Sequence, residues 1–192
     1  MNDSQLMIYS YLKVEKNFNF LNEDTSNMLY KQIKDSSPKE ETKYLRLLNS
    51  FKPILRDKYK ESSKFMHLFP FLINQIPVIL GENDLKKVLS IQEKYNQNVT
   101  SSDEILYNSE YLKKNMFQDS TALMILLKKD FIYSNNLRGF TLFTIKLIKS
   151  LGFKIILLKE RDFSPYCFPS EVLQNFDETP YRSKLLEILK DV

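Results

Sequence analysis

The sequence predicts a protein of mixed class, α+β or α/β, with a helical N-terminal half (residues 1–100) and a small α/β domain (residues 101–192). Three observations support this. Up to residue 95, apolar residues recur at steps of three and four, which is typical of amphipathic helices. Residues 122–127 and 153–158 are instead unbroken apolar runs, as in strands buried on both faces. A helical period separates these runs, which predicts a strand–helix–strand crossover with parallel strands in one sheet.

The N-terminal helices are predicted from their start signals. Residues 24–26 (Asp-Thr-Ser) and 37–41 (Ser-Pro-Lys-Glu-Glu) combine a capping side chain with proline or acids in the first turn, and residues 81–84 combine glycine with an Asn or Asp cap. We expect Pro53 to end or kink the second helix. Residues 63–80 are more apolar and contain two prolines, which favours short, interrupted helices.

The C-terminal domain begins after the polar residues 96–102. Residues 101–120 mix apolar pairs with turn residues and are expected to form short strands or a hairpin. The crossover helix should end at Gly152, in the position of a left-handed C-cap. Thr179–Pro180 starts a final amphipathic helix. The crossover helix is expected to turn inward Phe140, Phe143, Leu147, Ile148 and Leu151, and the final helix Leu185, Leu186 and Leu189.

Composition excludes several classes. One cysteine (Cys167) and one histidine (His67) can form neither a disulfide framework nor an ordinary zinc site, and the lack of disulfides indicates a reducing, intracellular compartment. No apolar run reaches the roughly 18 residues of a membrane span, so no membrane partner is predicted. The three glycines are dispersed and form no phosphate-binding loop, so no cofactor is predicted. The first residues read as neither a signal nor a transit peptide.

Acidic residues follow both predicted strands. Asp130 comes after the first strand, and Glu160 and Asp162 come after the second, so all three are expected at the carboxyl edge of the sheet. A metal-dependent nuclease with Asp130 and Glu160 as ligands is therefore one alternative. Charged strand ends that simply meet water are the favoured interpretation. The C-terminal half also contains no acid-x-Lys pair of the kind a restriction-nuclease site needs. We predict neither catalytic residues nor metal ligands.

Basic residues gather in the same segment, with aromatic residues between them. This composition is typical of surfaces that bind phosphates and stack unpaired bases, although lysines on helix surfaces and strand ends are also ordinary solvation. We predict that single-stranded RNA is the partner. The predicted RNA-binding residues are Lys128, Lys129, Arg138, Lys146, Lys149 and Arg161 for phosphate, and Phe131, Tyr133 or Phe163 for stacking.

Residues 121–191 resemble the RAP domain, which occurs at the C-terminus of FAST-kinase-domain proteins and in organellar RNA-processing factors. The resemblance lies in Leu137–Gly139, Lys146, the turn Leu151–Lys154 and the closing helix with Leu185 and Leu189. It implies a restriction-endonuclease-like fold, RNA as partner, mitochondrial RNA processing or stability as the setting, and no assured catalysis. The chain departs from the family in having no tryptophan, with residues 159–163 in place of the family's aromatic–tryptophan element. A non-catalytic scaffold that binds proteins through its helical half remains a further alternative.

Overall fold

The computed structural model describes residues 14–15, 42–68, 75–94, 104–107, 113–133, 136–167 and 179–190. Within these ranges the helices are α3 (Thr42–Tyr59), α4 (Glu82–Lys94), α5 (Gly139–Ser150), α6 (Glu160–Cys167) and α7 (Thr179–Ile188), with short 3-10 turns η1 (Lys60–Ser62) and η3 (Lys128–Asp130). The strands are β1 (Ser63–Leu68), β2 (Ile76–Ile79), β3 (Glu104–Tyr107), β4 (Thr121–Leu126), β5 (Phe131–Ile132), β6 (Asn136–Leu137) and β7 (Lys154–Lys159). The protein is therefore of the α+β class.

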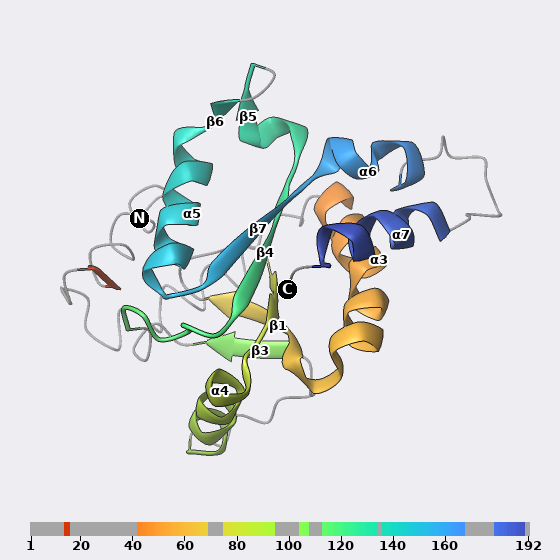
Figure 1. Cartoon of the computed structure of the whole chain (residues 1–192). Helices are drawn as coiled ribbons and strands as arrows, with labels where there is room; N and C mark the ends of the chain where they lie inside the picture. The colour runs from red at the N-terminus through yellow and green to blue at the C-terminus, as the bar shows by residue number, and fades with distance from the viewer. Residues whose placement is uncertain are drawn as a thin grey trace.

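Five of these strands form one mixed sheet in the order β3-β1-β2-β4-β7 (Figure 1). Strand β2 is antiparallel to both of its neighbours, whereas β1 and β3 are parallel, as are β4 and β7. The predicted crossover is confirmed: β4 and β7 lie side by side in a six-residue parallel register, and α5 connects them.

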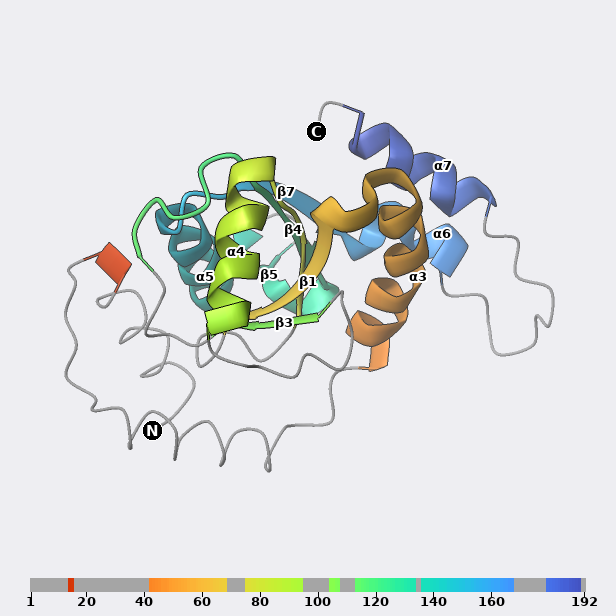
Figure 2. The same cartoon turned by 90° about the horizontal axis from the view of Figure 1, so that it is seen from below.

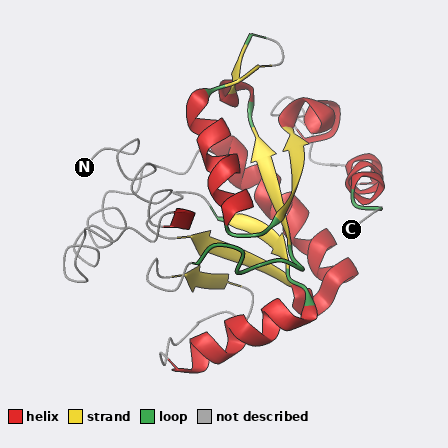
Figure 3. Cartoon of the chain, turned by 60° about the vertical axis from the view of Figure 1, so that its left-hand side comes forward, coloured by secondary structure: helices red, strands yellow, loops and turns green. Residues whose placement is uncertain are grey.

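Helices cover both faces of the sheet, so the domain has three layers (Figures 2 and 3). One hydrophobic cluster lies under α4 and α5, and a second lies under α3, α6 and α7. Strand β4 supplies both clusters alternately, with Ala122 and Met124 in the first and Leu123 and Ile125 in the second. This two-sided burial is why its sequence is an unbroken apolar run. No helix in the described ranges is long and apolar enough to cross a membrane.

The prediction of short helices over residues 63–80 is wrong, because β1 and β2 occupy most of this segment. Pro77 lies within β2, opposite Phe65 of β1. The pairing of β2 with β4 covers only Val78 and Ile79, so the missing N–H of Pro77 removes no bond from that ladder. The sheet thus takes strands from both sides of residue 100, where the sequence suggested a domain boundary.

Helix α3 continues through Pro53 to Tyr59, so the proline does not end the helix. A proline inside a helix costs about 3 kcal/mol. The residues beside it, Phe51, Ile54 and Leu55, are almost completely buried against the sheet, and this burial offsets the cost. The predicted helix starts at residues 24–26 and 37–41 lie outside the described residues, and of residues 101–120 the structure describes β3 and the turns at 113–120.

The predicted end of the crossover helix is confirmed. Helix α5 ends at Ser150, Leu151 is its C-cap, and Gly152 follows with a φ of +101°. The last carbonyls of α5 are not left unpaired, because the Ser150 and Leu151 oxygens accept N–H groups of Asn115 and Phe117. The residues at 113–117 therefore close the helix end against the sheet.

Candidate nucleic-acid interface

The parallel strands β4 and β7 end at the same edge of the sheet, which we call the carboxyl edge. Turn η3 and the β5–β6 hairpin follow β4 there, α6 follows β7, and α5 begins there before running back along the sheet (Figure 1). This topology brings together side chains that are up to 33 residues apart in the sequence, from Lys128 to Arg161. Of the six predicted phosphate-binding cations, the carboxyl edge carries Lys128, Lys129, Arg138 and Arg161.

Asp130 holds this edge together. Its carboxylate accepts the Leu127 N–H at 2.7 Å and the Thr141 hydroxyl at 3.1 Å. Its backbone carbonyl accepts the Arg138 N–H at 2.8 Å. Asp130 therefore fastens turn η3 to the beginning of α5, and it does so with both of its carboxylate oxygens.

Glu160 makes the second link, between β7 and the end of β4. Its carboxylate accepts the Lys128 N–H at 2.8 Å and pairs with Lys43 of α3 at 3.4 Å. Because Asp130 and Glu160 bind consecutive backbone N–H groups, the predicted meeting of the two acids at the carboxyl edge is confirmed. The third acid, Asp162, lies 4.0 Å from Arg161. In the described ranges, no group of three or more His, Cys, Asp or Glu side chains is placed to hold a metal ion.

The predicted cations fall into two connected sets. Lys128, Lys129 and Arg138 are exposed at the carboxyl edge, and Arg138 also begins a stripe along α5. Residues 138, 142, 146 and 149 follow each other at helical spacing and are all exposed, so Lys146 and Lys149 extend the positive surface down the outer side of α5. Helix α5 has 12 residues and is therefore about 18 Å long.

Arg161 differs from the other cations because it lies over the ring of Phe131, 5.9 Å from the ring centre. Phe131 is only half-exposed, and the stacking role predicted for Phe163 is wrong, because this ring is completely buried against Phe51. The guanidinium covers one face of the Phe131 ring, so Phe131 has less surface for stacking than the sequence suggested. The contact between Arg161 and Phe131 instead fixes the position of one positive charge at the carboxyl edge.

Tyr133 is the most accessible aromatic residue of the edge, with 89% of its surface exposed and a backbone φ of +52°. Ile132, Phe140 and Leu142 are each exposed by 45–47%. Together with Tyr133 they make up four of the five large hydrophobic residues that are exposed among the described residues. All four lie on the β5–β6 hairpin or the first turn of α5, directly beside the cations.

The inward position predicted for Phe140 is wrong. Thr141 and Thr144 are buried in its place, along with Leu147 and Ile148. The Thr141 hydroxyl donates to Asp130, and the Thr144 hydroxyl donates to the Phe140 carbonyl at 3.1 Å. Hydrophobic periodicity assigns Phe to the core before Thr, and nothing in the sequence marks Asp130 as the partner that makes Thr141 an inward residue.

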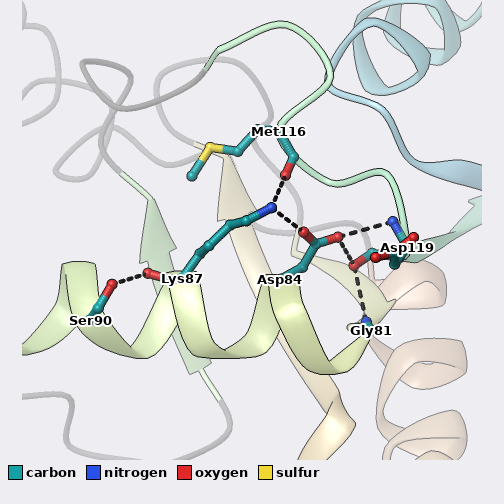
Figure 4. A network of polar contacts seen from close by, with 7 residues as sticks. Gly81, Asp84, Lys87, Ser90, Met116 and Asp119 are labelled. Carbon is teal, nitrogen blue, oxygen red and sulfur yellow. Dashed lines mark hydrogen bonds and ion pairs between the residues drawn. The ribbon is translucent and has the colours of Figure 1, made fainter.

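A second polar cluster, at the opposite end of β4, is also not predicted by the sequence (Figure 4). Asp84 of α4 is 1% exposed, and one carboxylate oxygen accepts the Ser120 hydroxyl at 2.8 Å and the Asp119 N–H at 3.1 Å. The other oxygen pairs with Lys87 at 2.9 Å. The Gly81 N–H donates to Ser120 at 3.1 Å, which closes the network. Every group faces another group of the cluster, so this cluster joins α4 to β4.

Comparisons with protein-family models, with curated proteins and with solved structures found no match.

Proposed function

We propose that this protein binds single-stranded RNA at the carboxyl edge and along α5, and that it does not cleave the RNA. The observation that carries the proposal is the shared location of exposed cations and exposed aromatic rings. Phosphate binding needs accessible Lys and Arg, and base stacking needs accessible ring faces. Lys128, Lys129 and Arg138 supply the first, while Tyr133 and Phe140 supply the second.

Cleavage is not part of the proposal, because the acids of this edge already have structural partners. Asp130 and Glu160 accept backbone N–H groups that would lose their acceptors if the carboxylates turned toward a cation. The strands β4 and β7, with sequences TALMIL and KIILLK, contain no acidic residue that could complete an acid-x-Lys pair.

The setting is proposed from the resemblance of residues 121–191 to the RAP domain, which suggests RNA processing or stability in mitochondria. Helix α3 precedes the sheet strands β1, β2, β4 and β7, which are neighbours in that order, and α5 connects β4 to β7. This order of elements supports a restriction-endonuclease-like arrangement.

Fluorescence anisotropy with a short labelled single-stranded RNA tests the proposal. We expect the logarithm of the binding constant to fall linearly with the logarithm of salt concentration, with a slope of about −0.7 for each phosphate contacted. The double variant Lys146→Glu, Lys149→Glu should bind at least tenfold more weakly and show a shallower slope.

The matched control is the double variant Lys86→Glu, Lys190→Glu, which changes the net charge equally on α4 and at the end of α7, away from the proposed surface. If both double variants lost RNA affinity equally, the loss would result from the change in net charge alone. This outcome would contradict the proposed site. Salt-independent binding, or binding to anionic lipid vesicles without RNA binding, would contradict the function. Magnesium-dependent cleavage abolished by Asp130→Asn would favour the nuclease alternative.

A further inference from the structure

Strand β7 forms one end of the five-stranded sheet, with β4 on its inner side (Figure 2). In the described part of the chain, no strand pairs with its outer side. An unpaired edge offers backbone N–H and C=O groups to another strand. Natural proteins commonly shorten, twist or cover such edges, but β7 is six residues long and regular in its pairing with β4.

The register identifies which backbone groups point outward. The Lys154 N–H donates to the Ser120 carbonyl at 2.9 Å, and Lys154 pairs with Thr121. In a parallel ladder the residues of one strand alternate, so Lys154, Ile156 and Leu158 face β4 with their N–H and C=O groups. The backbone groups of Ile155 and Leu157 therefore face away from the sheet, and they are the ones that a further strand would bind.

The side chains of β7 are less covered than those of its neighbour. All six residues of β4 are buried, whereas Ile155, Ile156 and Leu157 are only partly buried although they belong to the two hydrophobic clusters. A strand placed beside β7 would cover apolar surface on both faces of the sheet. Lys154 and Lys159 flank this apolar run at its two ends.

The flanking lysines decide which strand fits. If a second copy of the chain paired with β7 antiparallel about a two-fold axis, the outward-facing Ile155 and Leu157 would lie opposite each other, with Leu158 opposite Lys154 and Phe153 opposite Lys159, so neither lysine would gain an opposite charge. Opposite charges directly across a ladder are stabilising. An extended segment with acids at both ends would instead place opposite charges at both positions, whether it ran parallel or antiparallel to β7.

We propose that the outer edge of β7 binds an extended segment of a partner protein, which has an apolar centre and an acidic residue at each end, by adding a strand to the sheet. The backbone of Ile155 and Leu157 forms the new ladder. Lys154 and Lys159 select the partner and fix its register. This site uses residues outside the RNA-binding set and does not depend on the proposed function.

The test uses the full chain and a capped peptide, Glu-Val-Thr-Val-Val-Glu, with amide hydrogen exchange followed by NMR. Peptide binding should slow exchange of the Ile155 and Leu157 amides, while the amides of Ile156 and Leu158, which already face β4, should change little. A peptide with both glutamates replaced by lysine should bind roughly fivefold more weakly, as expected for losing two cross-strand charge pairs.

The double variant Lys154→Glu, Lys159→Glu should reverse this preference in favour of the lysine peptide. A retained preference for the glutamate peptide would overturn the proposed role of the lysines. Binding without protection of Ile155 and Leu157 would overturn strand addition. If the chain dimerised with increasing concentration, and if this protected the same two amides without peptide, the edge would bind a second copy of the chain. That result would overturn the proposal of a partner protein.

Discussion

At both ends of strand β4 an aspartate carboxylate makes the same kinds of hydrogen bond, but the surroundings of the two ends differ. At the amino end, Asp84 accepts one backbone N–H, from Asp119, and one hydroxyl, from Ser120. At the carboxyl end, Asp130 also accepts one backbone N–H, from Leu127, and one hydroxyl, from Thr141. Each carboxylate therefore fastens β4 to a helix, α4 in the first case and α5 in the second.

The surroundings of the two carboxylates differ. Asp84 is buried and its nearest cation, Lys87, pairs with it directly. Around Asp130 the side chains of Lys128, Lys129 and Arg138 are exposed, and the aromatic residues Tyr133 and Phe140 are exposed beside them. A carboxylate at a strand end thus indicates no function by itself. The exposed basic and aromatic surface around Asp130 is the reason why we propose the carboxyl end, and not the amino end, as the RNA interface.

The largest effect that this comparison predicts is for Asp84→Ala. The change leaves the buried Ser120 hydroxyl without its acceptor and also removes the acceptor of the part-buried Asp119 N–H, whereas Lys87 is half-exposed and can regain water. We expect the free energy of unfolding to fall by about 2–4 kcal/mol, because the buried unsatisfied hydroxyl costs roughly 1–3 kcal/mol and the lost hydrogen bond from Asp119 adds about 1 kcal/mol. Urea denaturation followed by circular dichroism measures the loss.

The control for Asp84→Ala is Glu82→Gln on the same helix. Glu82 is exposed, and the hydrogen bond and charge of Lys86 hold the pKa of its carboxyl below the usual value. Since water screens this pair, no measurable change in unfolding is expected. A similar loss of stability in both variants would show that the charge pattern of α4, and not the buried network, fixes the amino end.

A second pair of variants compares the glycines at the starts of the two helices. Gly81 precedes α4, and a Cβ there would lie 2.5 Å from the Asp119 carbonyl oxygen. Gly139 begins α5, and a Cβ there would meet no atom within 4 Å. We expect Gly81→Ala to lower the free energy of unfolding by about 1–3 kcal/mol through overpacking, and Gly139→Ala to raise it by roughly 0.5–1 kcal/mol.

Thermal unfolding of the two alanine variants, measured side by side, checks this prediction. Equal behaviour of Gly81→Ala and Gly139→Ala would mean that the close approach of α4 to residue 119 is not tight in solution. Unchanged RNA affinity in Gly139→Ala would also show that the start of α5 tolerates added bulk.

The crossover of β4, α5 and β7 was predictable because each part has a local signal: two unbroken apolar runs, a helical period and Gly152 at the helix end. Strands β1 and β2 were not. Strand β2 has only four residues and contains Pro77, and the second partners of β1 and β2, which are β3 and β4, lie 39 and 44 residues further along the chain (Phe65 to Glu104 and Val78 to Ala122). Apolar runs of this length fit a buried helix or a buried strand equally well, and tertiary pairing decides between them.

The residues of the proposed interface were also predictable only in part. The cations were predictable as a group, since they are concentrated in one segment of the sequence. Their separation into an edge set and an α5 set depends on where the chain turns back, at the two-residue strands β5 and β6, which are too short to leave a pattern. Phe140 is exposed next to the inward-facing Thr141, whose hydroxyl donates to Asp130, and no local pattern in the sequence marks this contact.

The smallest effect on stability, and the sharpest test of the carboxyl end, is expected for Tyr133→Gly. A left-handed backbone is unfavourable for tyrosine and free for glycine, so the free energy of unfolding should stay the same or rise by less than about 1 kcal/mol. The RNA affinity should nevertheless fall by roughly tenfold, because one stacked base contributes about 1–3 kcal/mol. Anisotropy titrations and urea denaturation of the same preparation separate the two quantities.

If the variant were less stable, Tyr133 would be a structural residue like Asp84; if it were as stable and bound RNA normally, the ring would have no part in binding. A loss of affinity without a loss of stability is the result that would distinguish this end of β4 from the other.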